Sequence, residues 1–152
     1  MPDYPPVVIV GACPVGCVLA LCLAKQQVPV VLLERADDLA EDLRASTFHP
    51  PTLEMLDKLY LTERLISMGV LAPTYQYRDR RSAKQAIFDL AALADETRHP
   101  YRLQCDQFKL TRLISEELKQ YRHVTVQFGS SVARFEARND AVDVTVAHRG
   151  GD

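Results

Sequence analysis

The sequence predicts an α/β fold whose first elements are a strand, a helix and a strand built around a parallel sheet. Two apolar segments rich in valine, 7–10 and 30–33, lie on either side of an apolar stretch of helical length. A glycine ends the first segment and a proline precedes the second. Continuous apolar strands are typical of parallel sheets that are covered on both faces. We therefore expect both segments to be buried strands of one parallel sheet.

The first strand is expected over Val7–Val10, because four β-branched residues follow one another there. Gly11 ends this strand, and a helix should run from Pro14 to about Gln27, since proline is tolerated in the first turn of a helix. The second strand, Val30–Leu33, follows the helix. This order predicts a Rossmann-like βαβ unit.

The turn after the first strand has the chemistry of a dinucleotide-binding site. Gly11 permits a tight turn, and the N-terminus of the following helix offers unpaired N–H groups and a positive dipole to a pyrophosphate. Glu34, at the end of the second strand, can accept a hydrogen bond from a ribose hydroxyl. Cys13 replaces the middle glycine of the usual motif. If one charge-assisted phosphate contact is lost there, affinity falls about tenfold to a few hundredfold.

Length, charge and composition exclude several classes of protein. The chain has 152 residues and a formal net charge of −2 at pH 7, so we expect no nucleic-acid partner. The uncharged stretch 7–24 is interrupted by Gly11, Pro14 and Gly16, and no basic residue precedes it. We therefore predict neither a membrane span nor a secretory signal, and a cytoplasmic location.

The four cysteines do not form a recognisable disulfide framework or zinc site. Cys13, Cys17 and Cys22 crowd into one apolar segment, and Cys105 lies far from them in the sequence. The spacing lacks the paired C-x₂-C units of zinc sites. We expect most of them to be buried, reduced thiols, and no metal site.

Residues 7–16, which include Gly11, Pro14, Val15 and Gly16, resemble the first strand and the G-A-G-P-V-G turn of the FAD-dependent aromatic hydroxylases. These are flavoprotein monooxygenases with the para-hydroxybenzoate hydroxylase fold. The resemblance covers nearly the whole chain and implies FAD as the cofactor. Cys13 is the position where this chain departs from the motif.

Three further segments are similar to cofactor-binding segments of that family. Glu34 and Arg35 resemble the acid–arginine pair whose acid takes the adenosine ribose. Arg44 opens a segment, 44–56, similar to one whose leading arginine lies along the ribityl and phosphate region. Gln107 begins a helix similar to the one whose first glutamine reaches FAD, whereas Arg112 in the same helix suits an ordinary surface cation equally well.

The rest of the chain is expected to serve the flavin site and the substrate site in turn. Residues 1–71 form the FAD-binding βαβ unit and its following helices, and 72–100 leave it as a β-hairpin over 74–80 and 86–90 that belongs to the substrate sheet. Residues 101–152 return as a helix and a β meander. The meander is expected over 124–128, 132–138 and 141–148. Later flavin motifs of the family are absent, which suggests a fragment or a truncated product.

The resemblance implies a flavin-dependent monooxygenase that uses NAD(P)H and O₂ to hydroxylate a small aromatic, usually phenolic, molecule. FAD carries that chemistry, and we nominate no catalytic residue. The resemblance is compatible with a homo-oligomer in the full-length protein. Two alternatives stay open: a truncated, non-catalytic relative with weak or no nucleotide binding, and an NAD-binding dehydrogenase half.

The chain has only 6 glycines, and the resemblance indicates at which positions glycine is missing. Family members usually have glycine where this chain has Cys13, Gln27 and Tyr60. The last two positions lie at helix ends that often need a positive φ. We therefore expect Gln27 and Tyr60 to cost stability, about 1 kcal/mol each.

Overall fold

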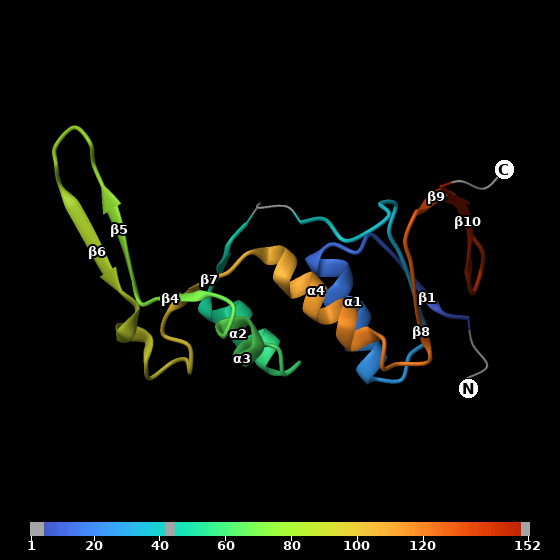
Figure 1. The fold of residues 1–152 in the computed structure, drawn as a ribbon, viewed down its shortest axis with the longest axis horizontal. Helices are drawn as coiled ribbons and strands as arrows, with labels where there is room; N and C mark the ends of the chain where they lie inside the picture. Colours follow the sequence, from blue (N-terminus) through green and yellow to red (C-terminus); the bar gives the residue numbers. More distant parts are fainter. Residues whose placement is uncertain (1–4, 42–44, 150–152) are drawn as a thin grey trace. The chain divides into compact units, whose positions relative to one another are not determined.

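The computed structural model of the chain describes residues 5–41 and 45–149. Two compact units make up the chain. The first combines Met1–Asp42 with Leu110–Asp152, and the second is Leu43–Lys109. Figure 1 shows the elements of both units along the chain.

The first unit is built on a parallel sheet of three strands in the order β1-β2-β8. β1 (Val7–Val10) and β2 (Val30–Leu33) pair in parallel, and β8 (Val124–Gln127) pairs with the other edge of β2. Helix α1 (Pro14–Lys25) connects β1 to β2 and packs beside the sheet (Figure 1). The predicted βαβ unit is confirmed.

The two strands differ in burial, and the expectation that both would be covered on both faces is wrong for β1. The central strand β2 has three fully buried residues out of four. In β1 only Ile9 is buried, while Val10 is 63% exposed. The cause is position, because β1 is the edge of the described sheet and pairs with a neighbour on one side only.

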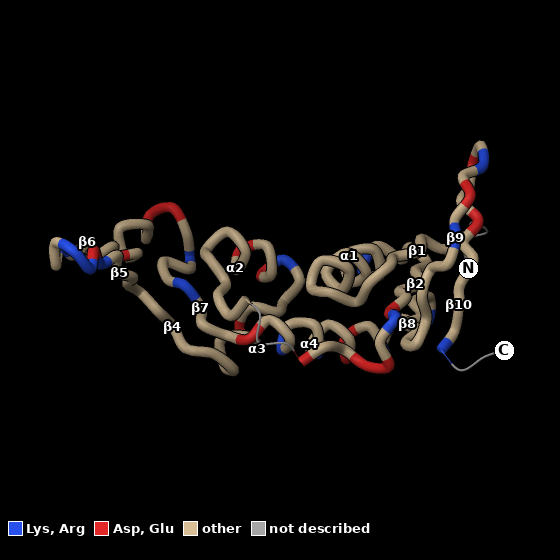
Figure 2. Tube along the Cα trace, turned by 90° about the horizontal axis from the view of Figure 1, so that it is seen from above, with Lys and Arg blue, Asp and Glu red and all other residues tan. Residues whose placement is uncertain are grey.

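The predicted three-stranded meander at the end of the chain is also corrected. β8 joins the parallel sheet, and only β9 (Ser130–Ala137) and β10 (Val142–His148) form an antiparallel hairpin. Gly129 makes the change of direction possible, since its φ of +60° lies in the left-handed region. In Figure 2 this hairpin carries both acidic and basic residues.

Two helices are followed by non-glycine residues whose backbone lies in the left-handed region, as predicted. Gln27 and Tyr60 both have φ of 62°. After α1, the N–H of Val28 donates to the carbonyl of Leu23 and that of Gln27 donates to Ala24, both at 3.0 Å. This is the Schellman arrangement, in which glycine is the usual residue at the left-handed position.

The second unit is built on an antiparallel sheet of three short strands in the order β3-β7-β4. These are β3 (Thr47–Phe48), β7 (Arg102–Gln104) and β4 (Val70–Ala72). Two helices, α2 (Pro50–Asp57) and α3 (Thr62–Ile66), follow β3. The buried residues of this unit include Phe48, Leu53, Leu56, Leu61, Leu65 and Leu103.

The predicted hairpin of the second unit is confirmed. β5 (Thr74–Arg78) pairs with β6 (Gln85–Asp89) as a separate two-stranded sheet, and a short 3₁₀ helix, η1 (Leu90–Leu93), follows. Almost all of its residues are exposed.

Helix α4 (Gln107–Leu118) begins at the glutamine that was expected to open it. Its buried residues are Leu110, Thr111, Ile114 and Leu118, which recur at helical spacing. Among the helices of residues 5–41 and 45–149, none is both long enough and apolar enough to cross a membrane.

Candidate dinucleotide-binding site

The turn between β1 and α1 requires both of its glycines, for different reasons. Gly11 has a φ of +99°, a conformation that residues with side chains rarely adopt, although a Cβ added there would meet no atom within 4 Å. Gly16 has an ordinary backbone, but a Cβ there would overlap the carbonyl oxygen of Gly11 and would approach Ile9. The first glycine therefore sets the turn, and the second lets the helix pack tightly against it.

The N-terminus of α1 suits an anion. Cys13 is the N-cap residue, with no side-chain hydrogen bond to the helix, and Pro14 occupies the first turn. The first turn holds no acidic residue, and α1 is free of charged residues until Lys25 near its end (Figure 2). No negative charge within the helix therefore offsets the positive end of the helix dipole, and the unpaired N–H groups of the first turn remain available to an anion.

Two cysteines near this turn differ in environment, and the expectation of buried thiols is wrong for Cys13. Cys13 is exposed and has extended backbone angles, φ −70° and ψ 170°, so its replacement of glycine causes no backbone strain. Cys17 is buried, and its Sγ donates to the carbonyl of Ala12 at 3.2 Å. Burial, with electrostatic interactions with Cys13 and Glu34 adding to it, raises the pKa of Cys17 to about 12. Cys17 is therefore a structural thiol.

Glu34 links the end of β2 to the glycine turn. Its Oε2 accepts a hydrogen bond from the N–H of Ala12 at 2.8 Å, and its Oε1 accepts from the N–H of Ala36 at 2.9 Å. Both bonds are partly buried and join backbone to a carboxylate. The acid expected from the sequence is thus fixed beside the turn that precedes α1.

A cavity of about 640 Å³ opens beside Arg35, the residue after this acid. The β9–β10 hairpin forms its other wall, because the N–H of Ser130 donates to the carbonyl of Glu34 and that of Gly129 donates to Ala36, both at 2.8 Å. The cavity has three basic side chains. Its lining residues are Arg35, Ala36, Gly129, Ser131, Ala147, His148 and Arg149.

The first unit thus brings together most of the site residues expected from the sequence. These are Gly11, Cys13, Pro14, Val15, Gly16, Glu34 and Arg35. Arg44 lies outside the described residues. Gln107 is half-buried at the start of α4, in the second unit, where its N–H donates to the carbonyl of Ala45 at 3.2 Å.

Arg112, whose role the sequence left open, forms ion pairs within the first unit. Its guanidinium donates to both carboxylate oxygens of Asp38, at 3.1 and 3.0 Å, and to Glu41 at 3.0 Å. The hydrogen bond from Arg112 lowers the pKa of Asp38. Arg112 therefore ties the segment after β2 to α4.

A partly buried set of hydrogen-bonded side chains in the second unit could not be assigned from the sequence. The Nε2 of His99 contacts Oδ2 of Asp57 at 2.6 Å, and its Nδ1 contacts the Tyr101 hydroxyl at 2.9 Å. Burial opposes ionisation of Asp57, but hydrogen bonds from His99 and Thr62 outweigh it and lower the pKa of Asp57. These contacts connect the segment before β7 to α2.

Comparison with known proteins identifies the family. The FAD binding domain family matches residues 4–152. The 6-hydroxy-3-succinoylpyridine 3-monooxygenase of Pseudomonas putida strain S16 is 32% identical over 92% of this chain and 36% of its own length. The para-nitrophenol 4-monooxygenase of Pseudomonas sp. strain WBC-3 is 29% identical over 95% of this chain and 36% of its own.

Solved structures show the same relationship. The p-nitrophenol 4-monooxygenase of Pseudomonas putida DLL-E4 superposes with a TM-score of 0.91 at 31% identity, over 99% of this chain and 38% of its own. An anhydrotetracycline hydroxylase from Streptomyces rimosus superposes with a TM-score of 0.82 at 26% identity, over 96% of this chain and 28% of its own. The chain thus spans about a third of the length of these relatives. It belongs to the FAD-binding domain family of the flavin-dependent aromatic monooxygenases.

Proposed function

We propose that the chain is the FAD-binding portion of a monooxygenase that hydroxylates a small aromatic molecule, of the phenolic class, with NAD(P)H and O₂. The observation that carries this proposal is the link between Glu34 and the glycine turn, in which a carboxylate and the N-terminus of α1 lie side by side. A dinucleotide needs both, one for a ribose and one for a pyrophosphate.

Each residue of the turn has a proposed task in holding FAD. Gly11 and Gly16 keep the turn tight, and the backbone at Cys13, Pro14 and Val15 faces the pyrophosphate at the start of α1. Proline has no N–H, so Val15 and the residue after it are the donors of the first turn. FAD, when bound, supplies the redox chemistry of the reaction.

Glu34 and Arg35 are proposed to hold the adenosine end. A carboxylate has about four acceptor positions, and the N–H groups of Ala12 and Ala36 use two of those of Glu34. The remaining positions suit the two ribose hydroxyls. The cavity beside Arg35 then receives the adenine, with the guanidinium against the base. Arg44 and Gln107 are proposed to contact the flavin half.

The remaining features of the full-length protein are proposed from the resemblance and the composition of the chain. The β5–β6 hairpin, within residues 72–100, is proposed to join a substrate-binding sheet. We place the protein in the cytoplasm, where NAD(P)H is available and thiols such as Cys17 and Cys105 stay reduced. We propose no nucleic-acid or membrane partner, and a homo-oligomer of the full-length protein is compatible with these assignments.

A titration with FAD tests the proposal. The chain, purified and stripped of nucleotide, should turn yellow on addition of FAD and hold it in near-equimolar amount after gel filtration. NAD titrated in parallel should bind far more weakly, because a dehydrogenase half would prefer it. Colourless protein that does not respond to added FAD would refute the proposal.

A second candidate, a relative with weak or no FAD binding, is favoured by Cys13 at the middle position of the motif. It predicts an FAD affinity too low to survive gel filtration. It also predicts no substrate-dependent oxidation of NAD(P)H, even with excess FAD and with the rest of the polypeptide supplied.

A further inference from the structure

The β9–β10 hairpin forms one wall of the cavity beside Arg35, and the proposed contacts to FAD leave the side chains of this wall without a task. The residues of the wall are Gly129, Ser131, Ala147, His148 and Arg149. A backbone hydrogen bond fixes the wall to the end of β2, because the N–H of Ser130 donates to the carbonyl of Glu34 at 2.8 Å. Side chains of the hairpin therefore keep their place relative to the residues proposed to hold the adenosine end.

His148, at the end of β10, is held by a buried serine. Its Nδ1 contacts the hydroxyl oxygen of Ser130 at 3.0 Å. Ser130 is only 2% exposed and lies opposite His148 in the register of the hairpin. The imidazole itself is exposed and lines the cavity. The Nδ1 edge of the ring is thus anchored in the protein.

The hydrogen bonds of Ser130 decide which nitrogen of His148 carries the hydrogen. A serine hydroxyl has one hydrogen, and that of Ser130 is donated to the carbonyl of Phe128 at 3.0 Å. The hydroxyl oxygen is then left as an acceptor toward His148. The neutral ring therefore carries its hydrogen on Nδ1 and donates it to Ser130, which leaves Nε2 as an acceptor. Within residues 5–41 and 45–149, no group forms a hydrogen bond with this Nε2.

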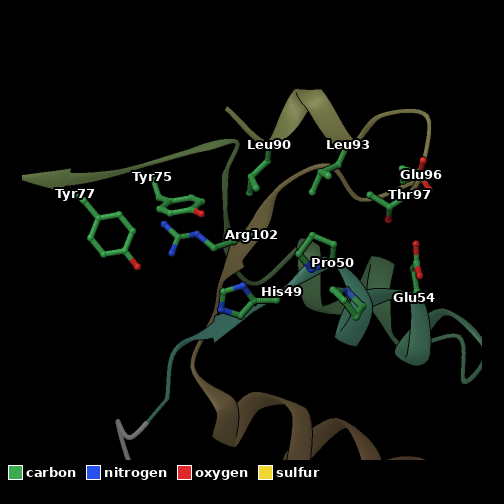
Figure 3. Close-up of a pocket in the computed structure, with 11 residues that line it drawn as sticks. His49, Pro50, Glu54, Tyr75, Tyr77, Leu90, Leu93, Glu96, Thr97 and Arg102 are labelled. Carbon is green, nitrogen blue, oxygen red and sulfur yellow. The ribbon is translucent and has the colours of Figure 1, made fainter. Parts of the chain in front are cut away.

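The other three histidines of the chain differ from His148. The Nε2 of His99 contacts a carboxylate oxygen at 2.6 Å and that of His123 contacts a backbone carbonyl at 3.0 Å, so both rings carry hydrogen on Nε2. His49 lines the cavity of the second unit (Figure 3), and no described residue forms a hydrogen bond with its ring. His148 is thus the one histidine of the described chain whose contacts leave an acceptor at Nε2.

The other polar side chains of the cavity beside Arg35 do not supply an acceptor of fixed position. Arg35 and Arg149 have guanidinium groups, which only donate, and Arg149 is paired with Asp37 at 3.4 Å. The hydroxyl of Ser131 is exposed and can rotate. His148 therefore gives this cavity its oriented acceptor.

We propose that His148 recognises the adenine base of FAD by accepting a hydrogen bond at Nε2 from the exocyclic amine, and that Ser130 positions the ring for this contact. Adenine has an amino donor at C6, whereas guanine and hypoxanthine have a carbonyl oxygen there. An acceptor that meets an acceptor makes no hydrogen bond, which disfavours the 6-oxo bases. The proposal deepens the proposed function and rests on it for the presence of a purine in this cavity.

The tautomer of His148 provides the first test, without any nucleotide. The chain is labelled with ¹⁵N in its four histidines and measured by long-range ¹H–¹⁵N NMR at about pH 8, above the usual range in which imidazole gains a proton. His148 should carry its hydrogen on Nδ1, whereas His99 and His123 should carry it on Nε2. In Ser130→Ala, the ¹⁵N shifts of His148 should move toward those of His49, whose ring is not fixed. A His148 ring with its hydrogen on Nε2 in the unmodified chain would overturn the proposal.

Two nucleoside diphosphates test the recognition of the base. ADP and IDP have the same sugar and the same charge, and they differ at C6, which has an amine in ADP and a carbonyl in IDP. Isothermal titration calorimetry of the unmodified chain should show that ADP binds about tenfold or more tightly than IDP. Equal affinities, or tighter binding of IDP, would overturn the proposal.

Variants show whether His148 causes this preference. His148→Phe keeps an aromatic ring and removes the acceptor, so ADP should lose its advantage over IDP. Ser130→Ala should lose part of that advantage, because the hydrogen of His148 can then move to Nε2. His123→Phe is the matched control, since this histidine lies outside the cavity, and it should keep the full preference. A preference for ADP that persists in His148→Phe would contradict the proposal, and thermal midpoints show whether each variant is folded.

A titration with FAD separates this proposal from the proposed function. Binding of FAD together with equal affinities for ADP and IDP would uphold the flavin assignment and overturn the role of His148. A preference for ADP without binding of FAD would support the role of His148 and refute the flavin assignment. No binding of FAD, ADP or IDP would refute both.

Discussion

The carboxylate of Glu34 accepts a hydrogen bond from the backbone N–H of Ala12 at 2.8 Å, across 22 residues of sequence. The bond joins the end of β2 to the turn that follows β1. Because the second oxygen accepts from Ala36 at 2.9 Å, the side chain is held from both sides. Glu34 is therefore oriented by the protein before any ribose binds.

The first prediction concerns this carboxylate. In Glu34→Gln the side chain loses its charge and one acceptor oxygen, so the bond to Ala12 or that to Ala36 is lost, together with a contact to the ribose. We expect FAD affinity to fall about 10- to 100-fold, the cost of one charge-assisted hydrogen bond. Fluorescence titration of FAD measures the change. Glu136→Gln, at an exposed ion pair with Arg134, should leave affinity unchanged.

The second prediction separates the roles of the two turn glycines. Gly16→Ala places a methyl group against the carbonyl of Gly11, a backbone atom that cannot move without shifting the turn. Gly11→Ala meets open space and costs only the strain of φ +99°, about 1–3 kcal/mol. Urea unfolding should therefore show the larger loss of stability for Gly16→Ala. Equal losses would mean that the helix can shift away from the turn.

Local signals predicted the first unit well. Val7–Val10, the glycine turn and Val30–Leu33 form the expected βαβ unit, because strand composition, turn chemistry and proline placement all act over a few residues. The positive φ at Gln27 was also predicted, from the resemblance to a family that usually has glycine at this position. The βαβ unit itself depends on neighbours in sequence.

Features that depend on distant partners could not be predicted. The apolar pattern of β1 looks like that of a central strand, but its burial depends on which strands pair with it. The valines of β8 suit a hairpin and a parallel sheet equally, and β2 decides the outcome. Arg102 is a further example, because its Nε is buried without a hydrogen-bond partner among the described residues, and such burial depends on parts of the fold that are distant in sequence.

The third prediction uses two adjacent glutamines at the end of α1. Gln27 has φ 62°, so Gln27→Gly removes the strain of a side chain in the left-handed region and should raise the free energy of unfolding by about 0.5–1 kcal/mol. Gln26 has φ −90°, so Gln26→Gly relieves no strain and should lower stability by a similar amount through backbone entropy. Urea unfolding of both variants measures the difference. Changes of the same sign would contradict the interpretation.

The fourth prediction concerns the missing glycine of the phosphate turn. Cys13 adds a Cβ and a thiol at the N-cap of α1, where a pyrophosphate is proposed to approach the backbone. Cys13→Gly should therefore tighten FAD binding by about tenfold or more, the reverse of losing one phosphate contact. Cys13→Ser keeps a side chain of similar size and should not. Unchanged affinity in Cys13→Gly would show that the backbone is already accessible.

The fifth prediction concerns the pH dependence of stability. Burial raises the pKa of Cys17 from 9.0 to about 12, with electrostatic interactions with Cys13 and Glu34 adding to the shift. Above pH 9 the unfolded chain loses this proton while the folded chain keeps it. The folded state then binds more protons, so the free energy of unfolding falls as pH rises from 9 towards 12.

The slope of stability against pH isolates this contribution. Between pH 9 and 10.5, Cys17 should cost up to about 2 kcal/mol, since each pH step above its unfolded pKa costs about 1.4 kcal/mol. Cys17→Ala lacks the titrating group, so its stability should fall less steeply, although it starts lower because the bond to Ala12 is lost. Burial also raises the pKa of Cys105, but that residue is present in both proteins and its effect cancels in the comparison. Parallel slopes would show that the Cys17 thiol reaches solvent in the folded state.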